Sequence, residues 1–179
     1  VGEDGVTHHG VFDMAAFGAV PGLTVAAPMN EPELRNMMWT GLQASAPFMI
    51  RYPRGLGEGL PWRGLPFETL PVGRGRRLRE GRDVALVTVG TVGNAAARAA
   101  ERAAAQGVEA AHYDLRWVKP LDTELLDEVG RTFRRVITVE DGCLRGGVGE
   151  AVAAYFNARG YDAHVTCLGI GDAWVEHGT

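Results

Sequence analysis

The regular alternation of strand and helix patterns over residues 83–170 constrains the fold more than any other feature of the sequence. Strands joined by helices of about ten residues pair in parallel through right-handed crossovers. With an edge strand predicted at 74–80, the pattern indicates an α/β domain on a mostly parallel, five-stranded sheet. Apolar runs predict the other strands at 83–90, 108–116, 135–141 and 164–170, and helical patterns lie between them at 94–106, 122–130 and 148–159.

Single residues mark the ends of these helices. Gly107 and Gly160 follow the first and third helices, as C-terminal glycines often do, and Asp122 is placed to cap the second. The segment GGVG at 146–149 precedes the third helix. Its glycines suit either an anion at the helix N-terminus or close packing on the sheet, and the absence of a strand-first G-x-G-x-x-G order favours packing.

The first part of the chain carries shorter patterns. Residues 11–17 have room for a short helix, and apolar runs at 23–28 and 47–54 predict two strands. Between these strands, Asn30 and Glu33 form a capping-box signal for a helix. The inner face of that helix is predicted from the spacing i, i+3, i+4 and i+8 to be Leu34, Met37, Met38 and Leu42.

Repeated glycine and proline interrupt both periodicities at residues 55–72. We expect a linker at 58–72 between one domain at 1–57 and a second domain at 73–179. The chain begins without methionine and stops after WVEHGT with no closing helix. We therefore expect a piece of a longer polypeptide whose last domain is truncated.

Charge and hydropathy argue against several function classes. The net charge of −4 and a pI near 5.7 leave no basic stripe for nucleic acid or an anionic membrane. No apolar run reaches the roughly 18 to 20 residues that span a bilayer. Cys143 and Cys167 lie on different predicted elements without metal-ligand spacing, so we expect reduced thiols and a cytoplasmic protein.

The segment GEDGVTHHG at residues 2–10 is the densest functional candidate. Its glycines let a ligand approach the backbone, while Asp4, His8 and His9 supply groups that bind and move protons near neutral pH. Adjacent imidazoles on an extended segment point to opposite sides, so one of them is expected to face a site. A polar loop whose imidazoles bond carbonyl oxygens, and a metal site formed by these three residues, are the alternatives.

The segment RYPRG at 51–55 is the second candidate. Arg54 lies just beyond the end of a predicted strand, where open α/β sheets place their ligand crevices. Its guanidinium suits a phosphate or carboxylate, whereas Arg51, inside the strand, is better placed for a structural ion pair. An ion pair at a domain boundary would account for such an arginine nearly as well. The run RWVKPLD at 116–122 is interpreted as structural.

Taken in order, six segments resemble the carboxyl-terminal part of 1-deoxy-D-xylulose-5-phosphate synthases, transketolase-like enzymes of the thiamine-diphosphate superfamily. Transketolases carry THQP in place of THHG, and the β subunits of 2-oxo-acid dehydrogenases carry a QHS pattern, so THHG followed by FD favours the synthases. The resemblance covers essentially the whole chain, through GEDGVTHHGVFD, PGLTVAAP, RYPRG, RWVKPLD, ED...GGVGEAV and LGIGDAWVEHGT.

The resemblance implies a transferase, dependent on thiamine diphosphate and Mg²⁺, that decarboxylates pyruvate and joins the two-carbon unit to glyceraldehyde 3-phosphate. Its product would feed isoprenoid, thiamine and pyridoxal synthesis. Residues 1–57 would end a pyrimidine-binding domain, and 73–179 would form a transketolase carboxyl-terminal-type domain of a homodimer. Asp4, His8 and Arg54 would bind substrate, Arg54 through the acceptor phosphate, and His8 would also be catalytic as a proton relay.

The Mg-binding GDG segment of these enzymes, their diphosphate ligands and their activating glutamate have no counterpart in the sequence. The resemblance therefore implies that an upstream part of the same polypeptide binds both cofactors and that the isolated piece is inactive. Two other functions stay open. One is a noncatalytic assembly module of another transketolase-like enzyme, and the other is a metal-dependent hydrolase that uses Asp4, His8 and His9.

Overall fold

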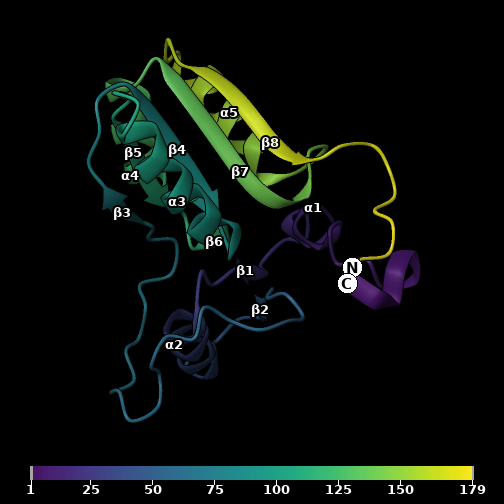
Figure 1. Ribbon diagram of the computed structural model, residues 1–179. Helices are drawn as coiled ribbons and strands as arrows, with labels where there is room; N and C mark the ends of the chain where they lie inside the picture. Colours follow the sequence, from purple (N-terminus) through teal and green to yellow (C-terminus); the bar gives the residue numbers. More distant parts are fainter. Residues whose placement is uncertain (1, 179) are drawn as a thin grey trace.

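The computed structural model describes residues 2–178 and contains two sheets (Figure 1). The larger sheet has the order β3-β5-β4-β7-β8, in which only the β3–β5 pair is antiparallel. The predicted α/β class and the mostly parallel, five-stranded sheet with residues 74–80 at one edge are confirmed. The strands are β3 Arg76–Arg79, β4 Val84–Val89, β5 Ala110–Asp114, β7 Arg135–Cys143 and β8 His164–Ile170.

Helices cover both faces of this sheet (Figure 1). From β4 the chain moves one way to β5 through α3 Val92–Ala104, and then returns across β4 to β7 through α4 Thr123–Thr132. The chain continues to β8 through α5 Val148–Arg159, which packs beside α4. Because right-handed crossovers in opposite directions lie on opposite faces, α3 covers one face and α4 with α5 covers the other.

The main core lies between the sheet and the α4–α5 pair. Val87 and Tyr113 from the strands meet Leu126 from α4 and Phe156 from α5, all buried. The predicted helix ends are confirmed: the Asp122 carboxylate accepts from the backbone N–H of Leu125, and Gly160 has the left-handed φ of 70°.

The smaller sheet has the order β2-β1-β6, formed by β2 Phe48–Ile50, β1 Thr24–Ala26 and β6 Trp117–Lys119. The chain before it forms η1 Gly2–His8 and α1 Asp13–Gly18, and α2 Glu31–Leu42 follows β1. β6 comes from the second half of the chain and pairs antiparallel with β1. The segment RWVKPLD is therefore structural, as predicted, and it also joins the two halves.

The predicted inner face of α2 is half wrong. Met37 is fully buried against Ala26 and Trp117, and Leu34 is partly buried. Met38 and Leu42, however, are 57% and 81% exposed. The small sheet is too narrow to cover the whole apolar stripe of the helix, so only part of that stripe is in the core.

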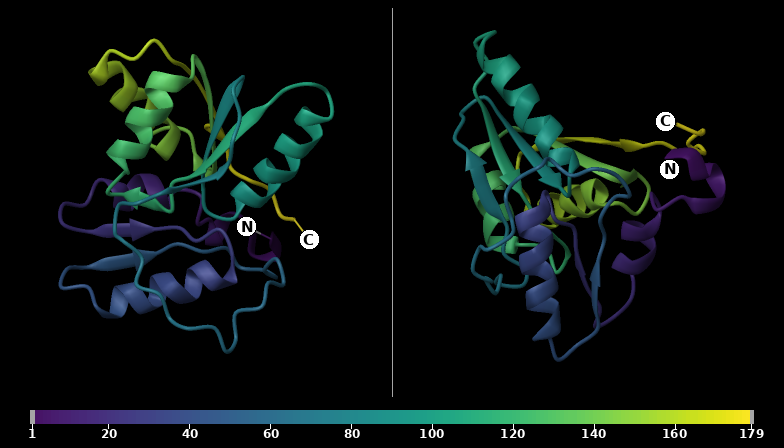
Figure 2. Two further views of the ribbon diagram at one scale, coloured as in Figure 1. Left: turned by 90° about the vertical axis from the view of Figure 1, so that its left-hand side faces the viewer. Right: turned by 60° about the horizontal axis from the view of Figure 1, so that its bottom comes forward.

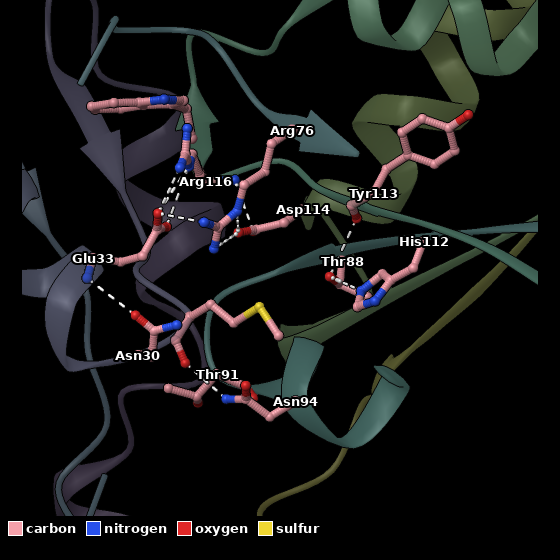
Figure 3. A network of polar contacts seen from close by, with 12 residues as sticks. Asn30, Glu33, Arg76, Thr88, Thr91, Asn94, His112, Tyr113, Asp114 and Arg116 are labelled. Carbon is pink, nitrogen blue, oxygen red and sulfur yellow. Dashed lines mark hydrogen bonds and ion pairs between the residues drawn. The ribbon is translucent and has the colours of Figure 1, made fainter. Parts of the chain in front are cut away.

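An ion-pair network with two buried carboxylates joins the halves beside this small sheet (Figure 3). The Glu33 carboxylate on α2 forms ion pairs with two arginines, with Arg116 Nη2 at 2.7 Å and with Arg76 Nη1 at 3.0 Å. Arg76 also reaches the fully buried Asp114 at 3.1 Å. Asn30 caps α2 as predicted, but the Glu33 side chain does not return to complete the capping box because the two arginines bind it.

Cys143 and Cys167 are both free thiols. Within residues 2–178, no helix has the combination of length and apolar character that crossing a membrane requires.

Candidate functional site

A cleft of about 600 Å³ opens where the connections of the large sheet change direction, between β4 and β7. Open α/β sheets bind ligands at such points, beyond the carboxyl ends of the strands. Both halves of the chain contribute to the cleft, so its shape depends on how they are joined. The lining includes residues 28–31, 52–53, 55–58, 91–92 and 140–141.

The sequence predicted an extended conformation for the segment that carries Asp4 and His8. That prediction is wrong, because the segment forms the short 3-10 helix η1. Gly5 interrupts η1 with φ 63° and ψ −151°, and the Thr7 hydroxyl donates to the Asp4 carbonyl at 3.2 Å. The His8 ring is exposed and its Nδ1 lies 2.9 Å from Thr7 Oγ1. The helical turn, rather than strand alternation, therefore sets the directions of the two imidazoles.

Arg54 forms an ion pair with Asp4 through Nη1 and Oδ2, which brings together two of the three predicted substrate-binding residues. The Arg54 side chain is 77% exposed, and its neighbours Pro53 and Gly55 line the cleft. A guanidinium has five N–H donors. Asp4 can thus orient this group while a largely exposed fork still meets an anion at the edge of the cleft.

Arg51 has a structural role, as predicted. Its side chain is buried and binds Asp13 at 3.2 Å, and its Nη2 donates to the Asp141 carbonyl at 2.5 Å and to the Asp141 carboxylate at 3.1 Å. Burial raises the pKa of Asp13, although the adjacent Arg51 charge opposes that shift. Arg51 therefore connects the end of β2 to both α1 and β7. These contacts hold in place the segment that leads to Arg54.

His9 lies against the last residues of the chain. Its Nε2 is 2.8 Å from the carbonyl oxygen of Val175, and its ring lies 5.6 Å from that of Trp174 and 6.0 Å from that of Phe12. The predicted alternative, an imidazole bonded to a backbone carbonyl, thus describes His9. Sequence reasoning did not identify Trp174 and Val175 as parts of this region, because no local pattern relates residues 165 positions apart.

The N-terminus of α5 is occupied by a carboxylate of the protein itself. Glu140 accepts from the backbone N–H groups of Val148 at 2.9 Å and Gly149 at 2.8 Å, and its burial raises its pKa. A Cβ at Gly149 would lie 2.5 Å from Thr138 Oγ1 and 2.9 Å from Cys167 Sγ. The glycines therefore serve close packing, as the sequence favoured, and Glu140 takes the place of an external anion.

Among the side chains that the structure describes, those of residues 4–178, no group of three His, Cys, Asp or Glu is arranged to hold a metal ion. Asp4 pairs with Arg54, His8 with Thr7 and His9 with Val175, so the structure does not bring the three together as ligands. The arrangement disfavours the metal-dependent hydrolase.

Comparison with known proteins identifies the class. A family model for the transketolase C-terminal domain matches residues 73–179, and one for the transketolase pyrimidine-binding domain matches residues 1–58. The chain belongs to the transketolase family and combines the end of a pyrimidine-binding domain with a C-terminal domain.

The particular relatives are 1-deoxy-D-xylulose-5-phosphate synthases. Those of Bacteroides fragilis and Bacteroides thetaiotaomicron are each 51% identical over 181 residues, which is 100% of this chain and 28% of the relative. A solved structure described as "Split gene transketolase, inactive beta4 tetramer" has a TM-score of 0.80 and 30% identity, covering 93% of this chain and 55% of that one. The resemblance to the C-terminal part of these synthases is thereby confirmed.

Proposed function

We propose that this chain is part of a 1-deoxy-D-xylulose-5-phosphate synthase and supplies the acceptor side of its substrate cleft. The reaction would join glyceraldehyde 3-phosphate to the two-carbon unit of pyruvate, with release of CO₂. The observation that carries the proposal is the Asp4–Arg54 pair at the edge of the cleft, in a chain 51% identical to such synthases. The shared sequence spans 28% of the relatives, so the rest of the enzyme would come from outside this chain.

Each residue of the candidate site has a role in this proposal. Arg54 binds the acceptor phosphate, because an exposed guanidinium fork matches phosphate oxygens. Asp4 orients Arg54 through the ion pair and approaches the substrate. His8, exposed on the same η1 segment, hydrogen-bonds a substrate oxygen and relays a proton as that oxygen gains or loses charge.

Residues 1–57 would complete the pyrimidine-binding domain of the synthase, 58–72 would be the linker, and 73–179 would be the C-terminal domain. Thiamine diphosphate and Mg²⁺ would be bound by the upstream part, since the described side chains of residues 4–178 gather no metal-ligand set. No step of the chemistry on that cofactor is assigned to this chain. The enzyme would be a cytoplasmic homodimer whose product enters isoprenoid and thiamine synthesis.

A chimera tests this proposal. This chain would replace the matching 181 residues of the Bacteroides fragilis synthase, and CO₂ release and product formation would be measured with pyruvate, glyceraldehyde 3-phosphate, thiamine diphosphate and Mg²⁺. We expect turnover, and a loss of about 10²- to 10⁴-fold on His8→Ala, the usual size of a positioned acid–base group. A folded chimera that binds the cofactor but releases no CO₂ would contradict the proposal.

A second function, the noncatalytic assembly module, is favoured by one observation. The transketolase-like structure with a TM-score of 0.80 is described as an inactive tetramer. An inert but correctly assembled chimera is the result that this alternative predicts, so the same assay separates the two functions.

A further inference from the structure

The chain after β8 runs along the outside of the fold to the N-terminal segment (Figures 1 and 2). We call residues 171–178 the C-terminal tail. Residues 171–178 form neither helix nor strand, and within them the Ala173 N–H donates to the Gly171 carbonyl at 2.8 Å. In all views it ends beside η1, which carries Asp4 and His8.

Aromatic rings form the first contact between the C-terminal tail and the N-terminal segment. The Trp174 ring lies edge-on to Phe12 with centroids 5.6 Å apart, and it lies 5.6 Å from the His9 ring. Both separations are in the range of attractive aromatic pairs. Phe12 immediately precedes α1, so Trp174 holds the stretch between η1 and α1 from outside.

A hydrogen bond forms the second contact. The Val175 carbonyl can only accept, so His9 Nε2 must carry the proton that joins them across 2.8 Å. This bond directs the His9 ring toward the C-terminal tail. His8, the next residue along the chain, is left exposed at the end of η1.

The third contact is made on a glycine. Gly5 is buried with a left-handed φ of 63°, and a Cβ at this position would overlap the ring of His177. The His177 ring therefore packs directly on the backbone at the kink of η1. That kink lies next to Asp4, whose carboxylate pairs with Arg54.

We propose that the C-terminal tail is a positioning element for the candidate site, in which Trp174, the Val175 carbonyl and His177 fix η1 so that Asp4 meets Arg54 and His8 faces substrate. None of the three would touch substrate. The local bonds of η1 are few, since it is a short 3-10 turn broken at Gly5, so contacts from the tail decide its geometry. The inference rests on the proposed function only for what the positioned residues do.

Hydrogen exchange of the 179-residue chain tests the positioning without any substrate. Trp174→Ala should speed exchange over residues 2–12 by about three- to tenfold, the factor that corresponds to losing an aromatic pair. Trp62→Ala is the matched control. Trp62 is exposed in the linker, and this substitution removes the same side chain at a position away from the C-terminal tail. Trp174→Phe, which keeps a ring, should restore most of the protection.

Two results would overturn the positioning. One is unchanged exchange over residues 2–12 in Trp174→Ala. The other is equal acceleration throughout β4, β7 and β8, which would mean that Trp174 stabilises the whole fold instead of this segment. Imidazole ¹⁵N spectra give a second readout, since the His9 Nε2–H signal should lose its single hydrogen-bonded position in Trp174→Ala and keep it in Trp62→Ala.

The catalytic consequence is tested in the chimera. Trp174→Ala should lower kcat/KM for glyceraldehyde 3-phosphate by about three- to tenfold, in line with the loosened segment, while Trp62→Ala leaves it unchanged. Faster exchange with unaltered kinetics would show that the tail holds η1 but does not serve the site, and would overturn the inference. Because the exchange experiment needs no turnover, its failure is distinguishable from failure of the proposed function.

Discussion

Arg51 and Arg54 lie three residues apart, but their guanidinium groups have different surroundings. Arg51 is buried between Asp13 and Asp141, whereas Arg54 is exposed and pairs with Asp4. A buried charge that loses its partner is costly, and an exposed pair contributes little to stability. Substitution of Arg51 should therefore affect mainly the stability of the fold, and substitution of Arg54 should affect mainly ligand binding.

The first prediction concerns the stability of these two variants. Arg51→Ala should lower the free energy of unfolding by about 3 to 5 kcal/mol, because it leaves the Asp13 carboxylate partly buried without its cation. Arg54→Ala should change it by less than about 1 kcal/mol. Urea unfolding of the 179-residue chain, followed by circular dichroism, measures both. Equal destabilisation by the two variants would show that Arg54 is also structural.

The second prediction concerns pH and His112, which is buried under α3 with Nε2 2.9 Å from Thr88 Oγ1. Burial, aided by the Arg76 charge, lowers the pKa of His112 from 6.5 to about 4. Its contribution to stability is therefore present above pH 6.5 and is lost as the pH falls through about 4. Asp114 acts oppositely: burial and Glu33 raise its pKa to about 6, so its contribution is lost as the pH rises through that value.

Comparing His112→Gln with the parent isolates the histidine, because Asp114 is present in both. The parent should be more stable at pH 7, because the variant lacks the buried imidazole ring that packs at this position. This advantage should shrink as the pH falls from 6.5 to 4, by on the order of 3 kcal/mol, since an uncharged Gln takes no proton on unfolding. Urea midpoints measured across this range test it. An advantage that stays constant with pH would contradict the lowered pKa of His112.

At the scale of elements, the β7–α5 junction depends on a helix that approaches the sheet closely. The third prediction is that Gly149→Ala destabilises the fold by about 1 to 3 kcal/mol, because the new methyl overlaps Thr138 and Cys167. Gly171→Ala is the control, since open space surrounds that position. Thermal unfolding of both variants measures the difference. A Gly149→Ala variant as stable as Gly171→Ala would mean that α5 moves outward at little cost.

Elements with strong local signals could be predicted from the sequence. The strands of the large sheet are continuous apolar runs, and the caps at Asp122 and Gly160 depend on neighbouring residues only. The three-residue strand β6 could not be predicted, since its pairing with β1 spans about ninety residues. For α2, periodicity identified an apolar stripe, but the width of the small sheet decides which part of it is buried.

In the candidate site, too, features set by neighbouring residues could be predicted and features set by distant residues could not. The structural role of Arg51 and the exposure of Arg54 could be predicted, because both depend on the position of the residue relative to the end of one strand. The partners could not be predicted: Asp4 for Arg54, Val175 for His9, and Arg116 for Glu33 are all distant in sequence. The 3-10 conformation of η1 was also missed, because it depends on the Gly5 kink and its contact with the C-terminal tail.

At the scale of the whole molecule, the cleft exists because three long-range connections hold the halves together. These are the β1–β6 pairing, the Glu33 network and the Arg51 pairs with Asp13 and Asp141. They place the exposed Arg54 beside the point where the large sheet reverses its connections. In this position, we propose, Arg54 binds the phosphate of the acceptor.

The most direct measurement compares two acceptors in the chimera, glyceraldehyde 3-phosphate and unphosphorylated glyceraldehyde, with pyruvate saturating. Loss of a guanidinium–phosphate hydrogen bond costs about 1.5 to 3 kcal/mol, or roughly 10- to 150-fold in kcat/KM. Arg54→Ala should therefore lower kcat/KM by that factor for the phosphorylated acceptor and have little effect on the other. If kcat/KM falls by the same factor for both acceptors, Arg54 supports the structure of the site and does not bind the phosphate.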